Sequence, residues 1–240
     1  MQNHLQHDQY GARRALLLFV RAPRPGEVKT RLAAEVGDAA ALRVYRRLAE
    51  HALREAKRVA SADLRIHYTP PEAGDEVRAW LGQGPGYLPQ PEGDLGTRME
   101  RAFGSTFAAG YGRVVIVGSD LPGLTSALLE RGFAALDGHP AVLGPAEDGG
   151  YWLLGLRHVV PDLFREIPWS TSEVLPRTVA RLREGGIEPA LLPALRDIDE
   201  AKHLPVGWES WAADAEPAGA RRGSGAGETF PPAAAYNRTR

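Results

Sequence analysis

The sequence contains no cysteine in its 240 residues, which excludes disulfides, thiolate catalysis and cysteine-ligated metal sites. It also lacks an excess of either charge, because 29 Lys and Arg residues nearly balance 30 Asp and Glu residues, for a net charge of −1. This balance argues against a broad surface for nucleic acid or membrane lipid. Long hydrophobic runs are missing too: the run at 15–20 is far shorter than a membrane span. We therefore expect a cytoplasmic protein whose partners are small molecules.

Composition divides the chain into three parts. Residues 1–12 are polar and rich in His and Gln, which is typical of a flexible leader. Over 13–205, strand-like and helix-like patterns alternate, which predicts a single α/β domain with a mostly parallel central sheet flanked by helices. In 212–240 large aliphatic residues almost disappear, so this tail cannot bury enough surface to offset its ordering entropy, and we expect it to be disordered.

The most informative stretch is 113–122, Arg-Val-Val-Ile-Val-Gly-Ser-Asp-Leu-Pro. Its β-branched run is apolar throughout, as in a strand that is covered on both faces of a parallel sheet. Asp120 follows directly, at the carboxyl end of that strand, where ligands of open α/β sheets bind. A hydrated Mg²⁺ held together with substrate phosphates would be a suitable partner for this carboxylate. Alternatively, Asp120 caps a helix that begins near Thr125.

The first predicted strand leads into a basic, turn-rich segment at 21–32. Lys29 and Arg31 come shortly after Gly26, and such a loop can bind a pyrophosphate with backbone N–H groups and two cations. It is not a Walker A loop, because Val28 stands where a glycine must precede the lysine. The alternative is an ordinary charged surface loop.

Two further acidic segments are candidates for chemistry. Asp148 is followed by Gly149 and Gly150, which would let the backbone approach a ligand closely, while the acid binds a sugar hydroxyl or acts as a base. Otherwise this segment is a tight turn between two strands. Asp197 and Asp199 alternate after an extended segment, so one of them could lie beside Asp120, or both could belong to a surface turn.

Three signals predict helix starts. Asp38 has the position of an N-cap for a long helix that ends near residue 60. Thr97 with Glu100, and Ser170 with Glu173, have the spacing of a capping box.

Five segments, taken together, resemble the DUF2064 proteins of the GT-A glycosyltransferase superfamily, which are often labelled glycosyltransferases of arsenosugar biosynthesis. The likeness runs in the same order from about Leu16 to Asp199. As a set it is specific for the family, and its segments are 21–32, 118–124, 144–156, 169–171 and 197–199.

The resemblance implies a nucleotide-diphospho-sugar transferase fold that uses Mg²⁺ or Mn²⁺. It places the metal on Asp120 and gives catalytic roles to Asp120, Asp148 and Lys29. Asp199, the second implied metal ligand, matches only the first residue of the family's Asp-Thr-Pro-Glu-Asp motif, because Glu200-Ala-Lys-His follows it. The implied substrate-binding residues are Gly26, Lys29, Arg31, Gly149, Gly150, Tyr151, Trp169, Ser170 and Thr171.

Three functions agree with these observations. The first is a glycosyltransferase that moves a sugar from a nucleotide sugar to a small-molecule acceptor. The second is a nucleotidylyltransferase that acts on an NTP and a phosphorylated small molecule, and the basic loop and the lone Asp120 favour it. The third is a non-catalytic nucleotide-binding module, which is permitted because only the first residue of the Asp-Thr-Pro-Glu-Asp motif is present.

Overall fold

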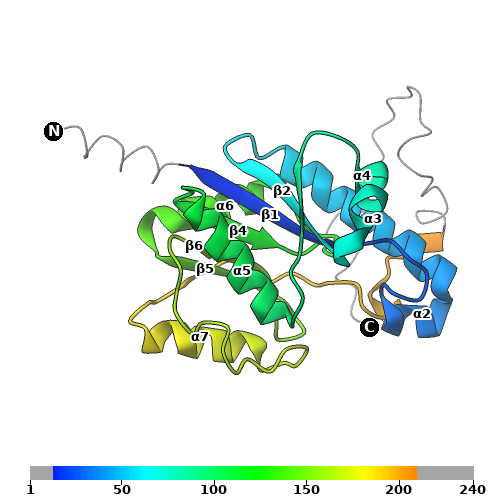
Figure 1. Cartoon of the computed structure of the whole chain (residues 1–240). Coiled ribbons are helices and arrows are strands. Elements are labelled where there is room, and N and C mark those ends of the chain that lie inside the picture. Colours follow the sequence, from blue (N-terminus) through cyan, green and yellow to red (C-terminus); the bar gives the residue numbers. More distant parts are fainter. Residues whose placement is uncertain (1–12, 210–240) are drawn as a thin grey trace.

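The computed structural model describes residues 13–209, so the expectations for 1–12 and for 212–240 lie outside the described residues. Within this range a single sheet is surrounded by helices (Figure 1). The strands and helices, in chain order, are β1 (Arg14–Arg21), α2 (Thr30–Val36), α3 (Asp38–Lys57), β2 (Asp63–Thr69), the 3₁₀ turn η1 (Pro71–Ala73), α4 (Gly74–Leu81), β3 (Gly86–Pro89), α5 (Leu95–Ala108), β4 (Arg113–Val117), α6 (Ser126–Gly138), β5 (Ala141–Pro145), β6 (Tyr151–Leu156), α7 (Val174–Glu184), β7 (Ala190–Leu191) and the 3₁₀ turn η2 (Ala201–His203).

The sheet has the strand order β3-β2-β1-β4-β6-β5-β7. Its pairs are parallel except where β6 lies antiparallel to β4 and β5. β6 is antiparallel to β5 because only the short turn 146–150 joins them, whereas parallel neighbours need a longer crossover. The predicted α/β fold with a mostly parallel sheet is confirmed.

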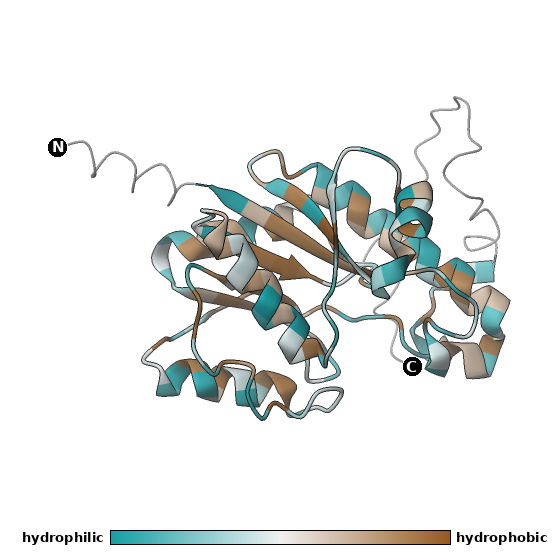
Figure 2. Cartoon of the chain, viewed as in Figure 1, coloured by the Kyte–Doolittle hydropathy of each residue, from teal (hydrophilic) through white to brown (hydrophobic). Residues whose placement is uncertain are grey.

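Helices cover both faces of the sheet. Leu16 and Leu18 of β1 pack in a cluster with residues of α3, α4 and α6, whereas Leu17 packs on the opposite face with residues of α5 and α7. The run 114–117 in β4 divides between the same two clusters, and its residues are at most 5% exposed. Figure 2 shows the strands as the most hydrophobic part of the interior. Burial on both faces explains why these strands are apolar throughout.

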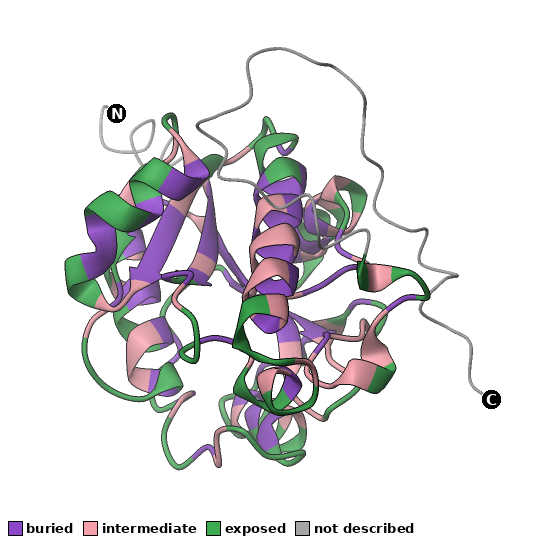
Figure 3. Cartoon of the chain, turned by 90° about the vertical axis from the view of Figure 1, so that its right-hand side faces the viewer, coloured by how far each residue is buried: buried purple, intermediate pink, exposed green. Residues whose placement is uncertain are grey.

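Helix starts differ from the predicted ones. Gly37 is the N-cap of α3 and Asp38 is its first helical residue. One side of α3 is buried, and its apolar residues lie there (Figure 3). The N-cap of α5 is Asp94, whose carboxylate accepts a hydrogen bond from the Thr97 N–H at 2.8 Å. Asp94 therefore accepts from the Thr97 N–H, which the Glu100 side chain would accept from in the predicted capping box.

The predicted capping box of Ser170 and Glu173 is also wrong. α7 begins at Val174 with Glu173 at its N-cap and no side-chain cap, so Ser170 lies four residues before the helix. Thr171 bonds a backbone amide just before the helix instead, because its hydroxyl accepts a hydrogen bond from the Glu173 N–H at 3.2 Å. In the part of the chain that the structure describes, no helix has the length and hydrophobicity of a membrane-crossing segment.

Candidate functional site

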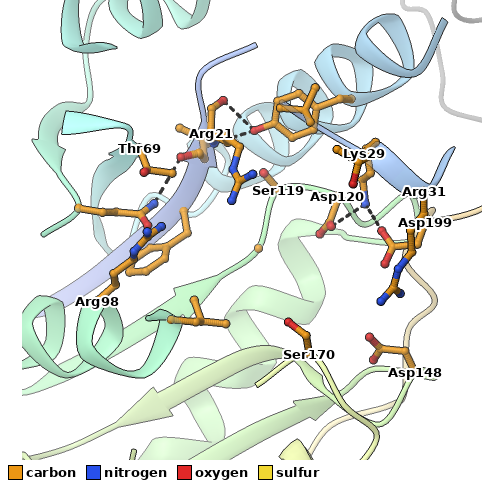
Figure 4. A pocket seen from close by; sticks show the side chains of 18 residues that line it. Arg21, Lys29, Arg31, Thr69, Arg98, Ser119, Asp120, Asp148, Ser170 and Asp199 are labelled. Atoms are coloured by element: carbon orange, nitrogen blue, oxygen red, sulfur yellow. Dashed lines mark hydrogen bonds and ion pairs between the residues drawn. The ribbon is translucent and has the colours of Figure 1, made fainter. Parts of the chain in front are cut away.

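A cavity of about 540 Å³ lies beyond the carboxyl ends of β1 and β4 (Figure 4). The register explains its position: Val117, the last residue of β4, pairs with Leu18, so β1 continues for three residues beyond its neighbour. The chain that leaves β4 therefore passes alongside the end of β1. The lining residues are Phe19, Val20, Arg21, Val28, Lys29, Thr30, Arg31, Tyr45, Thr69, Gln90, Leu95, Arg98, Gly118, Ser119, Asp120, Asp148, Ser170 and Asp199.

Asp120 lies at the edge of this cavity with its side chain 36% exposed. The turn that follows it is anchored from α3, because the His51 Nε2 lies 2.8 Å from the Leu124 carbonyl oxygen. Thr125, not Asp120, caps α6 and accepts a hydrogen bond from the Leu128 N–H. The capping interpretation of Asp120 is therefore wrong, and its carboxylate is left facing the cavity.

Asp197 and Asp199 approach Asp120 from the other end of the chain. Ile198 between them is fully buried in a cluster with α2 and α3, and its N–H contacts the Asp120 carbonyl oxygen at 3.5 Å. Because side chains alternate along an extended segment, burying Ile198 leaves both aspartates on the other side. Carboxylate oxygens of Asp120, Asp197 and Asp199 lie within 4.8 Å of one another. The surface-turn alternative for this segment does not hold.

Lys29 connects the two halves of the acidic cluster. Its ammonium lies 2.7 Å from Asp120 Oδ2 and 2.7 Å from Asp199 Oδ1, and its side chain is only 6% exposed. Lys29 is also the N-cap of α2, a helix in a segment for which the sequence predicts a loop, and its backbone is left-handed with φ 48°. Arg31 falls in the first turn of the same helix and lines the cavity.

The cluster shifts the protonation equilibria of its members. Burial alone lowers the pKa of the Lys29 ammonium, but Asp120 and Asp199 outweigh burial and raise it above its ordinary value. Burial raises the pKa of Asp199, and the attraction of Lys29 more than reverses this, so the pKa ends below its usual range. Burial, together with the charges of Asp199 and Asp120, raises the pKa of Asp197 to about 7. Asp197 is thus the carboxyl group without sufficient positive charge nearby.

The opposite wall of the cavity is basic. Figure 4 shows Arg21 and Arg98 on one side, with Lys29, Asp120 and Asp199 on the other and Asp148 and Ser170 below. Arg21 donates to the Glu27 carbonyl at 2.9 Å, and Arg98 donates to the Gly93 carbonyl at 2.9 Å. Both are anchored through these bonds while their guanidinium groups line the cavity.

Buried Tyr45 holds the end of β1 in place. Its hydroxyl accepts a hydrogen bond from the Arg21 N–H at 2.7 Å and donates one to the Arg21 carbonyl at 2.9 Å. A paired donor and acceptor of this kind satisfies the last backbone groups of the strand beside the cavity.

The acidic cluster is chemically suited to a divalent cation. Mg²⁺ and Mn²⁺ prefer hard carboxylate oxygens, and three are available here. The ammonium of Lys29 already lies between two of them, so the site accommodates positive charge at this point. Asp120, Asp197 and Asp199 would hold the ion.

Comparisons with known proteins identify the family of the chain. The model of the family described as "uncharacterized protein conserved in bacteria (DUF2064)" matches residues 52–171. A protein of Desulfovibrio desulfuricans G20, provisionally named a nucleotide-diphospho-sugar transferase, is 38% identical, with a TM-score of 0.74 over 78% of this chain and 82% of that one.

The chain belongs to the DUF2064 family.

A more distant likeness concerns the fold alone. The 4-diphosphocytidyl-2C-methyl-D-erythritol synthase of Anaerococcus prevotii DSM 20548 is 10% identical to this DUF2064 protein and has a TM-score of 0.54, covering 82% of this chain and 94% of that chain. A search of curated proteins found no match.

The structure of the DUF2064 protein brings half of the expected site residues to the cavity. Those that line it are Lys29, Arg31, Asp120, Asp148, Ser170 and Asp199. The others lie outside the lining, and they are Gly26, Gly149, Gly150, Tyr151, Trp169 and Thr171.

Contacts within the protein account for three of the residues outside the lining. A Cβ on Gly149 would lie 2.5 Å from Ser172 Cα, so this glycine permits close packing of two loops. The ring of Trp169 covers Gly96, where a Cβ would lie 2.7 Å from it. Tyr151 packs in the core cluster beneath α5 and α7. These contacts are structural, and ligand contacts by these residues stay predictions.

Several functional candidates were not found from the sequence. Asp197 was noted for its spacing from Asp199 but not included among the expected metal ligands, although the alternation around Ile198 was the signal for it. Arg21 belongs to the basic segment 21–32, but no local sequence signal indicates that Arg21, Arg98 or Tyr45 lines the cavity.

Proposed function

We propose that this DUF2064 protein is a metal-dependent transferase that uses a nucleotide-activated donor, and that the group it transfers is a sugar. The observation that carries the proposal is the acidic cluster of Asp120, Asp197 and Asp199 at the carboxyl end of the sheet, in one cavity with basic side chains. Open α/β sheets bind ligands at this edge. The 38% identical protein, provisionally named a nucleotide-diphospho-sugar transferase, supports the choice of a sugar donor.

The metal and the basic side chains have separate roles in binding the donor diphosphate. When bound, Mg²⁺ or Mn²⁺ would neutralise the charge that develops on the departing nucleoside diphosphate. Arg31 and Lys29, from the start of α2, bind the diphosphate from the same side as the acidic cluster. Arg21 and Arg98 face them across the cavity, so the donor's phosphates lie between two basic walls.

Asp148 and Ser170 form the part of the cavity that suits the sugar and the acceptor. The Asp148 Oδ1 accepts a hydrogen bond from the Gly150 N–H at 2.9 Å, which orients the exposed carboxylate. A carboxylate held in this way accepts hydrogen bonds from sugar hydroxyls, or takes the proton of an acceptor hydroxyl as it attacks. The Ser170 hydroxyl offers a further hydrogen-bonding group.

A nucleotidylyltransferase is the second candidate. The four cations Arg21, Lys29, Arg31 and Arg98 around one cavity favour it, because a triphosphate carries more negative charge than a diphosphate. In that case a phosphorylated substrate would attack the α-phosphorus, and pyrophosphate would leave.

The products distinguish the two reactions. The protein is incubated with Mn²⁺ and either a panel of sugar nucleotides or a panel of NTPs, together with mixtures of small-molecule acceptors. Release of nucleoside diphosphate from a sugar nucleotide supports the proposal, and pyrophosphate released from an NTP supports the second candidate. If neither forms while nucleotide binds without any metal dependence, the protein is a non-catalytic nucleotide-binding module.

A further inference from the structure

The ammonium of Lys29 lies where a bridging cation would be expected. It contacts Asp120 Oδ2 and Asp199 Oδ1 at equal distances of 2.7 Å, and both oxygens belong to the acidic cluster. The lysine side chain is 6% exposed, whereas the side chains of Asp120 and Asp199 are 36% and 32% exposed. The carboxylates are therefore open to the cavity on one side and neutralised by Lys29 on the other.

We propose that Lys29 is a resident cation of the metal-free protein, and that a divalent cation entering the acidic cluster displaces it. This inference rests on the proposed function, because it assumes that the acidic cluster is a metal site. The displaced ammonium is then available to the phosphates of the nucleotide. Metal binding and phosphate binding are thereby coupled through a single side chain.

Electrostatics requires the exchange. A divalent cation that shares oxygens with the ammonium would be repelled by it at a few ångströms, and the repulsion is strong in a partly buried site. Once a metal neutralises Asp120 and Asp199, the burial of Lys29 is no longer compensated, and burying an uncompensated charge is unfavourable. Both effects drive the lysine out of the cluster.

The backbone of Lys29 agrees with a conformation that depends on its ion pairs. Its φ of 48° lies in the left-handed region, which a residue with a side chain occupies only when surrounding contacts hold it there. No side-chain hydrogen bond caps α2 at this position. Its carbonyl accepts a hydrogen bond from the Ala33 N–H at 2.8 Å, and the two ion pairs with Asp120 and Asp199 hold its side chain.

Amine labelling tests the displacement directly in the unaltered protein. The chain has only three lysines, and Lys57 and Lys202 are exposed, so they serve as internal controls. An N-hydroxysuccinimide ester is applied with and without Mn²⁺, and labelling at each lysine is measured by mass spectrometry. We expect Mn²⁺ to raise labelling of Lys29 about tenfold, since a buried amine held in two ion pairs is protected from the reagent. Labelling of Lys57 and Lys202 should stay constant.

Mn²⁺ affinity provides the second measurement. Lys29→Met removes the competing cation while keeping a side chain of similar length, and we expect it to bind Mn²⁺ about tenfold more tightly than the unaltered protein. Arg31→Gln is the matched control, because it removes one positive charge from the same helical turn. The charge of Arg31 acts on Asp199 through space, but it does not lie between the carboxylates. Its affinity should change by less than about threefold. Lys29→Gln replaces Lys29→Met if the latter does not fold.

The outcomes separate the inference from the function on which it rests. If Mn²⁺ binds the unaltered protein but neither Lys29 labelling nor the affinity of Lys29→Met changes, the displacement is wrong while the metal site stands. If Mn²⁺ binds neither protein, the metal site of the proposed function is wrong and the displacement fails with it. Equal gains in affinity from Lys29→Met and Arg31→Gln would also overturn the displacement, because they would indicate only a general charge effect.

Discussion

Replacing Asp197 by asparagine should stabilise the metal-free protein at neutral and alkaline pH. Burial and the charges of Asp199 and Asp120 raise the pKa of Asp197 to about 7, well above its ordinary value of 3.8. The unfolded chain therefore releases this proton between about pH 4 and pH 7, where the folded protein retains it. Stability consequently falls as the pH rises through this window, and the loss is complete above pH 7.

The size of the effect follows from the pKa shift. A difference of about 3 pKa units corresponds to about 4 kcal/mol, and screening by solvent at this partly exposed site reduces it to about 2 kcal/mol. We expect Asp197→Asn to unfold at higher urea concentration at pH 8, by about 2 kcal/mol, and to match the unaltered protein near pH 4. Urea titrations in EDTA measure this difference. Asp148→Asn, at an exposed position of the same cavity, is the control and should change stability by less than about 0.5 kcal/mol.

The reasoning would be refuted if Asp197→Asn were less stable at pH 8, or if its gain did not depend on pH. A gain of the predicted size would mean that the carboxylate of Asp197 destabilises the metal-free protein. Such a cost is typical of groups whose position serves binding or catalysis.

Two further predictions concern stability. Burial, with a smaller contribution from the charge of Arg65, lowers the pKa of His67 to about 4. Below about pH 6.5 the unfolded chain therefore takes up a proton that the folded protein does not bind. The free energy of unfolding falls by about 3 kcal/mol by pH 4 as a result. His67→Phe should lose less stability than the unaltered protein over this range, and equal losses in urea titrations would contradict the assignment. Gly149→Ala should lower the free energy of unfolding by more than about 2 kcal/mol, because its Cβ would meet Ser172. Gly82→Ala is the control: Gly82 has a similar φ but open space around it, so it should lose only about 1 kcal/mol. Similar losses in both variants would refute the clash.

Local sequence was sufficient to predict the central strand β4 and the position of Asp120 just after it. Val114–Val117 is apolar throughout because helices cover both faces of β4, and this pattern is visible in the sequence without knowledge of its neighbours. Position at the end of a buried strand then placed Asp120 at the ligand-binding edge. The basic segment after β1 was located by the same reasoning.

Helix starts were less predictable because several residues compete for the same amides. Asp94 takes the N–H of Thr97, so the capping box that Thr97 appeared to begin does not form. The helix α2 has only seven residues, and its N-cap, Lys29, uses an unusual backbone conformation without a side-chain bond. Neither hydrophobic periodicity nor a capping signal marks such a helix.

The central contact of the site could not be read from the sequence. Lys29 meets Asp120 and Asp199 across sequence separations of 91 and 170 residues. The sequence indicated a basic loop that binds phosphate and an acidic site that binds metal, but not that the lysine neutralises the acids. That arrangement depends on the packing of α2 against α3, which buries Ile198 and directs its two flanking aspartates toward the lysine.

The most direct test of the account is metal-dependent nucleotide binding by Asp120→Ala. A thermal-shift screen of NTPs, nucleoside diphosphates and sugar nucleotides, with and without Mg²⁺ or Mn²⁺, identifies a ligand that raises the melting temperature of the unaltered protein. We predict that Asp120→Ala keeps its circular dichroism spectrum and loses the metal-dependent part of that shift. An unchanged metal-dependent shift in Asp120→Ala would contradict the assignment of the acidic cluster as the metal site.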